Sequence, residues 1–425
     1  MKVVNVLLLL LINLSSLIAQ NHWTHLRGNH LDGRAEAGSY PVFFELSDIQ
    51  IWKTPLEGLA WSSPVVFGNQ VWLTNATPDG SKLSVVCVDF TSGKILFDHV
   101  VYMPEEIQQM HATNSYATPT PAIEDGFVYI HYGTYGTACF NTRDFTLVWS
   151  RTDLNCQHMQ GAASSLLLHR DRLIVHIEGT DVQYIAALDK RTGEMLWKRH
   201  RPLDLYKDIA PVYRKAYTTP IVVMVEGVEQ LISNGAQLCI AYDVATGEEL
   251  WHLWYGYDST VGMPFVYNGI VYFNSGWIFE PDRASYVKLF AVDPRGRGDI
   301  AKTHLLWQTE TDVPQITTPV VVDENIYMVH ERGTVTCLKA ENGEVVWKER
   351  LRGMFNASPI YAGGHIYIID TRGTLYILKP SATYELVAEY GLGETVKATP
   401  GFVSGSLVVR TDKHLLRLHQ SSNNP

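Results

Sequence analysis

Cysteine and charged residues are scarce in this sequence, and basic residues are outnumbered by acidic ones. The 425 residues include 5 cysteines and 18% charged residues, with 34 Lys and Arg against 44 Asp and Glu, a net charge of −10. This balance lacks the basic excess of a nucleic-acid-binding surface. Beyond the N-terminus, no stretch approaches the run of about 18 apolar residues that marks a membrane-spanning helix. With 46% hydrophobic residues, the chain has enough apolar material for a packed core.

The N-terminus has the pattern of a secretory signal peptide. Lys2 precedes an apolar run over residues 6–12, and small and polar residues follow as far as Gln20. We therefore predict a signal peptide over residues 1–20 and a single domain over residues 21–425. The mature protein is expected to be secreted or periplasmic. No cysteine follows the cleavage region to carry a lipid, so we expect no membrane anchor.

One signature recurs along the chain: a strand, a turn rich in Asp, Thr, Gly and Glu, then an apolar pair and an aromatic residue. Its clearest copies cover residues 88–97, 188–197, 242–251 and 338–347. Asp or Asn followed by Gly suits a tight turn, and the flanking runs alternate as half-buried strands do. Each copy therefore predicts a strand–turn–strand unit. Four cysteines fall in these repeated strands, where we expect separate, buried thiols, and Cys156 falls in a loop.

A second marker, usually a proline after one or two small residues, precedes each copy. The markers are Pro64, Pro121, Ser165, Pro220, Pro264, Pro319, Pro359 and Pro400. Proline is tolerated where a strand begins, because no interior ladder bond is lost there. Eight markers predict an all-β, eight-bladed propeller of four-stranded antiparallel blades. The last unit has room for only three strands, so we expect the N-terminal strand around residues 49–53 to complete it and close the ring.

These residues resemble the quinoprotein-like β-propellers, the superfamily of pyrroloquinoline quinone repeats. The resemblance rests on the Asp-x-x-Thr-Gly-Glu-x-x-Trp repeat, on the opening residues 23–28 and on the stretch 114–119. It implies the fold for nearly all of the mature chain. It does not select an activity, because the superfamily includes quinone dehydrogenases, outer-membrane assembly scaffolds and polysaccharide lyases.

Polar residues are expected where the second strand of each blade ends, on the face around the central channel. These positions hold Thr74, His131, His176, Asn234, Asn274, His330, Asp370 and Arg410. The loops that enter the second to fourth blades add further polar groups to this face. We therefore predict that His111, His131, His158, His176, Arg214 and Tyr217 converge on one sector.

Such a cluster suits β-elimination at a uronic acid, which needs a base, an acid and a group that neutralises the carboxylate. We assign His131 and His176 as acid–base candidates, Tyr217 as an assisting acid and Arg214 as the charge neutraliser. His111, Asn114, His158 and Lys215 are expected to position the substrate. The pair His111 and His131 is similar to the apparatus of propeller lyases that cleave ulvan. Lyase and dehydratase action both remain open.

The expected partner is an acidic oligosaccharide or polysaccharide, with no nucleic acid, and the protein is expected to be a monomer. Elimination requires no organic cofactor, and no short metal-ligand motif occurs in the sequence. The main alternative is a non-catalytic periplasmic scaffold or glycan-binding propeller. A quinone-dependent dehydrogenase is a minor alternative: the resemblance implies a pair of adjacent cysteines for that class, and this chain has none.

Overall fold

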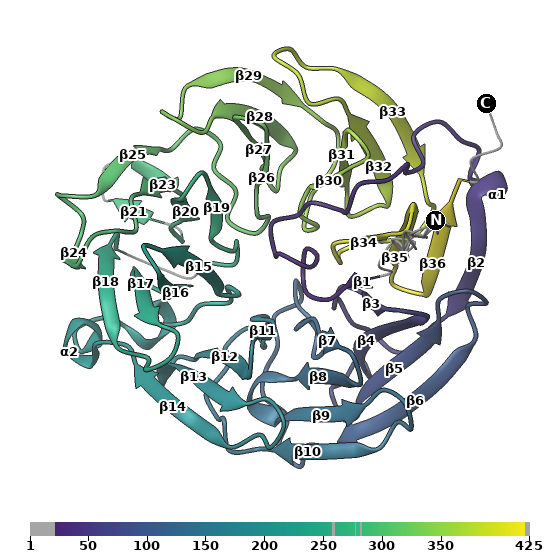
Figure 1. The fold of residues 1–425 in the computed structure, drawn as a ribbon, viewed down its shortest axis with the longest axis horizontal. Coiled ribbons are helices and arrows are strands. Elements are labelled where there is room, and N and C mark those ends of the chain that lie inside the picture. The colour runs from purple at the N-terminus through teal and green to yellow at the C-terminus, as the bar shows by residue number, and fades with distance from the viewer. Residues whose placement is uncertain (1–21, 257–259, 277, 281–282, 421–425) are drawn as a thin grey trace, which may run out of the picture.

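Eight antiparallel sheets surround a central axis (Figure 1), which confirms the predicted eight-bladed propeller of four-stranded blades. The computed structural model describes residues 22–256, 260–276, 278–280 and 283–420. The predicted signal peptide at residues 1–20 lies outside the described residues. Within each blade, consecutive strands pair with their neighbours, and the first strand lies innermost.

The first four blades take their strands in chain order. Blade 1 contains β3 (Val65–Phe67), β4 (Gln70–Ala76), β5 (Leu83–Asp89) and β6 (Ile95–Tyr102). Blade 2 contains β7 (Ala122–Glu124), β8 (Phe127–His131), β9 (Thr137–Asn141) and β10 (Leu147–Arg151). Blade 3 contains β11 (Leu167–His169), β12 (Arg172–Glu178), β13 (Gln183–Asp189) and β14 (Met195–His200). Blade 4 contains β15 (Ile221–Val225), β16 (Val228–Asn234), β17 (Leu238–Asp243) and β18 (Glu249–Trp254).

The last four blades continue the ring. Blade 5 contains β19 (Phe265–Tyr267), β20 (Ile270–Asn274), β23 (Leu289–Val292) and β25 (Leu305–Thr309). Blade 6 contains β26 (Val320–Val322), β27 (Asn325–Val329), β28 (Thr334–Lys339) and β29 (Val345–Arg350). Blade 7 contains β30 (Ile360–Ala362), β31 (His365–Ile369), β32 (Thr374–Leu378) and β33 (Leu386–Gly391). Blade 8 contains β34 (Gly401–Val403), β35 (Ser406–Arg410), β36 (His414–His419) and β2 (Gln50–Pro55).

A few short elements decorate this ring. They are β1 (His22–Trp23), β21 (Ile278–Glu280), β22 (Arg283–Tyr286), β24 (Gly298–Asp299), the helices α1 (Leu46–Ile49) and α2 (Leu203–Tyr206), and two 3-10 turns at Gly133–Tyr135 and Pro211–Tyr213. β1 pairs with the inner edge of blade 1, and β24 pairs in parallel with the outer strand of blade 4. Within the described residues, none of the helices has the length and apolar character needed to cross a membrane.

Both ends of the chain contribute to blade 8. β2 pairs antiparallel with β36, with Thr54 opposite Leu415. Trp52 then extends from this blade into blade 1, where its indole N–H donates to the carbonyl of Phe90 at 2.9 Å. The outer edge of β36 is therefore covered by a strand from the start of the chain, which removes an open edge.

The recurring turn holds neighbouring blades together. In blade 3, the Asp189 carboxylate accepts from the backbone N–H groups of Arg191 and Thr192, at 2.8 and 2.9 Å. Gly193 follows at a φ of +74°, a conformation that glycine adopts readily. The Trp149 indole from blade 2 packs directly on this glycine and donates to the Lys190 carbonyl at 2.9 Å. The aromatic residue of one repeat thus contacts the turn of the next blade.

The apolar core lies between the blades. Large side chains such as Trp72 and Trp251 are fully buried among strands of adjacent sheets. All five cysteines are buried and free. The sequence prediction placed Ser165 in the marker position of blade 3, but β11 begins at Leu167, so Leu166 occupies that position. The prediction was off by one residue because blade 3 has no proline to mark the start of its inner strand.

Candidate functional site

Two rings of side chains encircle the central channel where the chain enters the inner strands. We call the first the rim ring, three residues before each marker position: Trp61, Thr118, Ala163, Tyr217, Val261, Ile316, Asn356 and Lys397. We call the second the hydroxyl ring, one residue before each marker: Ser63, Thr120, Ser165, Thr219, Met263, Thr318, Ser358 and Thr399. All sixteen residues line one central pocket of about 200 Å³.

The hydroxyl ring ties adjacent blades together. The backbone N–H of Ser63 donates to the Thr120 hydroxyl of the next blade at 3.0 Å, and that of Thr120 donates to Ser165 at 2.9 Å. The backbone N–H groups of Ser165, Met263, Thr318 and Ser358 donate in the same way to the ring hydroxyl of the next blade, at 2.9–3.0 Å. Six of these hydroxyls therefore each accept a backbone N–H from the preceding blade, which fixes their positions around the pocket.

The pocket has one charged group in its lining, Lys397, and no carboxylate among its described lining residues. The Lys397 ammonium lies 3.6 Å from the centre of the Trp61 ring, in the range of a cation–π contact. Burial lowers the pKa of Lys397. A half-buried cation without a carboxylate partner in the pocket is a favourable place for an anionic group.

A second cation lies behind Lys397. Arg410 is buried and donates to the Thr74 carbonyl at 2.7 Å and to the Asn75 side-chain oxygen at 2.9 Å. Burial lowers the pKa of Arg410 to about 9. Lys397 and Arg410 line one small cavity, which Asp412 also lines, between blades 8 and 1. This side of the channel therefore carries two cations, with the Asp412 carboxylate beside them.

The opposite wall is built by loops of blades 2, 3 and 4. Asn114 donates to the carbonyls of Gln160 and Ala162, at 2.8 and 3.2 Å. The Tyr217 hydroxyl donates to the Gln160 side-chain oxygen at 2.7 Å. Asn114, Gln160 and Tyr217 all line the central pocket. The structure thus brings two residues predicted from the sequence, Asn114 and Tyr217, into one hydrogen-bonded wall.

Three of the predicted histidines lie together in a smaller cavity next to the central pocket. This histidine cavity, of about 10 Å³, has space for about one water molecule and is lined by His131, His158, Ala162, Ala163, Ser164, His176, Glu178, Ala216 and Tyr217. Ala163 and Tyr217 line both spaces. His131 is 2% exposed, and its Nδ1 lies 2.8 Å from the Thr137 hydroxyl. Burial lowers the pKa of His131 to about 3 and that of His158 to about 4, so both rings are neutral at pH 7.

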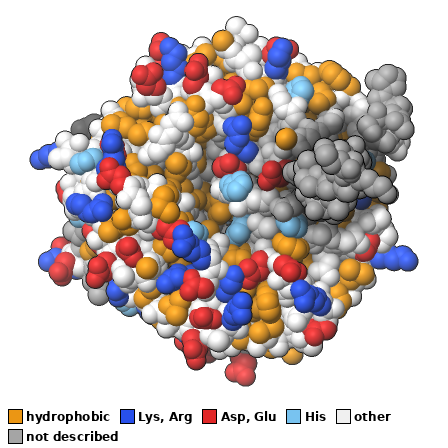
Figure 2. Space-filling model, viewed as in Figure 1, with side chains coloured by type: hydrophobic (Ala, Val, Ile, Leu, Met, Phe, Trp, Pro, Cys, Tyr) orange, Lys and Arg blue, Asp and Glu red, His pale blue; other side chains and the backbone are white. Residues whose placement is uncertain are grey.

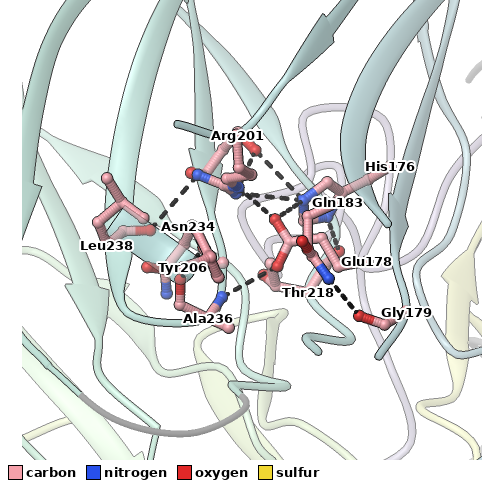
Figure 3. Close-up of polar contacts among 12 residues, drawn as sticks. His176, Glu178, Gly179, Gln183, Arg201, Tyr206, Thr218, Asn234, Ala236 and Leu238 are labelled. Atoms are coloured by element: carbon pink, nitrogen blue, oxygen red, sulfur yellow. Dashed lines mark hydrogen bonds and ion pairs between the residues drawn. The ribbon is translucent and has the colours of Figure 1, made fainter. Parts of the chain in front are cut away.

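His176 belongs to a buried charged network (Figure 3). Its Nδ1 faces the Thr218 carbonyl at 3.0 Å, and its Nε2 lies 2.9 Å from Glu178 Oε1. Arg201 forms an ion pair with the same carboxylate, and both side chains are almost fully buried. The Glu178 carboxylate also accepts the Ala236 N–H at 2.9 Å. Burial opposes ionisation of Glu178, but Arg201 and His176 outweigh it and lower its pKa.

The remaining predicted residues lie outside the histidine cavity. His111 is exposed, and its Nδ1 lies 2.7 Å from the hydroxyl of Thr113, which lines the central pocket. Lys215 is buried with its ammonium 5.7 Å from the Tyr217 ring. Arg214 donates to the Ile209 carbonyl at 2.7 Å and is not among the described residues that line either space. The structure therefore does not place Arg214 in either space, and its Nε–H is bonded to its own loop.

Sequence reasoning missed three charged residues. Glu178 and Arg201 lie on and just after the strands of blade 3, and Lys397 is the rim residue of blade 8. The sequence could have indicated Lys397, because it stands three residues before its marker, as the predicted site residue Tyr217 does. Arg201 was not, because its contact with Glu178 depends on how β14 leads into the following loop.

On the face shown in Figure 2, charge outside the central pocket gives no further indication of a site. Figure 2 shows acidic and basic side chains interspersed around the face in view. Ion pairs such as Arg143–Asp125 are exposed and contribute little. The central pocket, with its single cation, is therefore the stronger candidate.

The residues present do not fit the quinone that the sequence resemblance implies. Pyrroloquinoline quinone carries three carboxylates, whereas the pocket lining offers one cation, Lys397. A Ca²⁺ ion beside such a group needs oxygen ligands, usually carboxylates, and the described lining contains none. Among the residues that the structure describes, no group of three or more His, Cys, Asp or Glu side chains is arranged to hold a metal.

Comparisons with known proteins agree on the fold. Quinohemoprotein alcohol dehydrogenase from Comamonas testosteroni aligns with a TM-score of 0.67 at 12% identity, covering 95% of this chain and 82% of that one. BamB from Moraxella catarrhalis aligns with a TM-score of 0.58 at 14% identity, covering 87% and 99%. The computationally designed Ika8 protein aligns with a TM-score of 0.58 at 14% identity, covering 88% and 100%. Among curated protein sequences, no match is found.

A family model matches most of the chain. The model of the outer membrane protein assembly factor BamB matches residues 54–199, 181–294 and 291–383, which together span more than half of the 425 residues. These matches run from blade 1 to β32 of blade 7 and include the turn motif described above. The chain therefore belongs to the PQQ-repeat β-propeller family represented by the outer membrane protein assembly factor BamB.

Proposed function

We propose that the central pocket binds an acidic carbohydrate and that Lys397 pairs with its carboxylate. The observation that carries this proposal is the charge of the pocket: one half-buried ammonium and no carboxylate among the described lining residues. The buried guanidinium of Arg410 adds positive potential behind Lys397. A carboxylate placed there would stabilise the charged form of Lys397, whose pKa burial lowers.

The rest of the lining supports a sugar as the carrier of that carboxylate. Trp61 and Tyr217 supply aromatic surface, and Asn114, Gln160 and Asn356 supply amides. Sites for polar ligands combine apolar surface with a few placed polar groups in this way.

The reaction that we propose for this site is β-elimination at a uronic acid. A base removes the proton at C5, the bond between C4 and its oxygen breaks, a C4–C5 double bond forms, and an acid protonates the departing oxygen. Lys397 would take the role of charge neutraliser that the sequence assigned to Arg214. Tyr217, which lines both spaces, is our candidate acid.

His131 is our candidate base. Its ring is neutral at pH 7 and lines the histidine cavity, which shares Ala163 and Tyr217 with the central pocket. His176 is assigned a positioning role, because the Thr218 carbonyl and the Glu178 carboxylate engage both of its ring nitrogens. His111 and Asn114, near the pocket mouth, remain candidates for substrate positioning.

Calorimetric titration with uronate-containing oligosaccharides, ulvan fragments among them, tests the binding proposal. We expect Lys397→Met to weaken binding at least tenfold, whereas the exposed Lys94→Met serves as a matched control and leaves binding unchanged. Equal binding by Lys397→Met and the wild type would contradict the proposal, as would the absence of binding to every acidic saccharide tested.

The ultraviolet absorbance of the unsaturated uronate tests the reaction separately. A rise in the wild type that is lost in His131→Gln, with binding retained, supports elimination. The mass of the product then distinguishes loss of a sugar from loss of water. A flat trace with intact binding would reject elimination and leave a glycan-binding propeller.

A further inference from the structure

The N-terminal segment before β2 crosses the central channel (Figure 1). On one side, the Thr24 carbonyl accepts the Ile123 N–H of β7 at 3.0 Å, and the His25 Nε2 accepts the Leu168 N–H of β11 at 3.2 Å. On the other side, Ala35 donates to the Tyr361 carbonyl of β30 at 2.8 Å. Blades 2 and 3 lie opposite blades 6 and 7 in an eight-bladed ring.

The anchors of this segment lie in one layer of the channel. Ile123, Leu168, Val321 and Tyr361 each follow their marker by two residues, and all four bond to the segment. Val321 accepts from the Arg34 guanidinium at 2.7 Å. Because its bonds reach inner strands on opposite sides, the segment spans the width of the channel below both rings.

Arg27 fixes the middle of the segment. It is 1% exposed and donates to the carbonyls of Thr318 and Pro319, at 2.6 and 2.7 Å, and to that of Pro359 at 3.4 Å. These carbonyls lie in blades 6 and 7, at the level of the hydroxyl ring and the markers. The neighbouring Leu26 lines the central pocket. Leu26 therefore lies at the base of the pocket, supported by a segment that is bonded to both sides of the channel.

We propose that the central pocket is blind and recognises the terminal unit of an acidic oligosaccharide. This inference rests on the proposed function. A chain that passes through the site needs two openings, and the segment carrying Leu26 and Arg27 blocks the way through the ring. The ligand enters past the rim ring, its terminal carboxylate pairs with Lys397, and the rest of the chain extends outward.

Titration of glucuronate oligosaccharides of increasing length tests this proposal. We expect one protein molecule to bind per oligosaccharide at every length, with an affinity that reaches a plateau after the first few units. Oligosaccharides with bulky groups on both ends should bind at least tenfold more weakly than the uncapped molecules.

Several protein molecules on each long chain, or equal binding of capped and uncapped chains, would overturn terminal recognition while supporting the proposed function. No binding of any length would reject the proposed function itself.

A variant of the pocket base gives an independent measurement. Leu26→Trp reduces the depth of the pocket, so we expect it to weaken binding of the uncapped disaccharide at least tenfold, whereas the exposed Lys94→Met retains it. Unchanged binding by a folded Leu26→Trp variant would show that the terminal unit does not reach the base. Should this variant not fold, the capped oligosaccharides decide the question with the unmodified protein.

Discussion

Glu178 is an ionised carboxylate with almost no access to solvent. Arg201 and His176 stabilise its negative charge. The Glu178→Gln substitution keeps the shape but leaves the Arg201 guanidinium buried without a counter-charge. Breaking a buried ion pair in this way costs about 3–5 kcal/mol. We expect a loss of that size in the free energy of unfolding, measured by urea denaturation.

The exposed pair Arg143–Asp125 provides the matched control. Asp125→Asn should change the free energy of unfolding by about 0–1 kcal/mol, because solvent screens such pairs. Similar losses for Glu178→Gln and Asp125→Asn would show that the buried network in blade 3 contributes no more to the free energy of unfolding than an exposed ion pair does.

The lowered pKa of His131 predicts how the free energy of unfolding depends on pH. Its pKa is about 3 in the folded protein and about 6.5 when unfolded, so between these values only the unfolded chain binds the proton. The free energy of unfolding should therefore decrease as pH falls below 6.5, by up to about 1.4 kcal/mol per pH unit from this group. His131→Gln should show a shallower decrease between pH 6 and about pH 4. An identical slope in wild type and variant would contradict the burial of a neutral ring.

The repeated turn is the element that joins one blade to the next. At Gly193 an added Cβ would lie 2.7 Å from the Trp149 ring, at a φ of +74°. At Gly269 the φ is +76°, but no atom lies within 4 Å. The two glycines therefore separate the cost of backbone conformation from the cost of steric overlap.

We expect Gly269→Ala to cost about 1–2 kcal/mol of unfolding free energy, from the left-handed backbone alone. Gly193→Ala should cost at least twice as much, since the Trp149 ring must also move. Thermal or urea unfolding of the two variants measures the difference. Equal losses would mean that the packing of tryptophan on the turn does not join the blades.

The repeat in the sequence predicts these elements well, because Asp189 and Gly193 act through local backbone geometry. It does not predict that Trp149 contacts the turn of the following blade, since that contact depends on how the sheets are placed. The shift from Ser165 to Leu166 has a similar origin: without a proline, only the pairing of β11 with β12 shows where the strand begins.

At the scale of the whole molecule, the ring and its blade number follow from periodicity, but the candidate site follows only in part. His131 and His176 meet because they occupy equivalent positions in the second strands of adjacent blades, whereas His158 and Tyr217 come from the loops that enter blades 3 and 4. The charged groups do not follow this rule. Lys397 lies in blade 8, on the other side of the channel, and Arg214 bonds to its own loop. Long-range placement of single side chains is not encoded in the repeat.

The central claim is that Lys397 recognises a carboxylate in the central pocket. The most direct measurement compares a glucuronate oligosaccharide with its carboxyl-reduced, neutral form by calorimetric titration. Wild type should bind the acidic form at least tenfold more tightly, and Lys397→Met should bind both forms equally, because the charge that distinguishes them is gone. A preference for the acidic form that persists in Lys397→Met, or its absence in the wild type, would contradict this account.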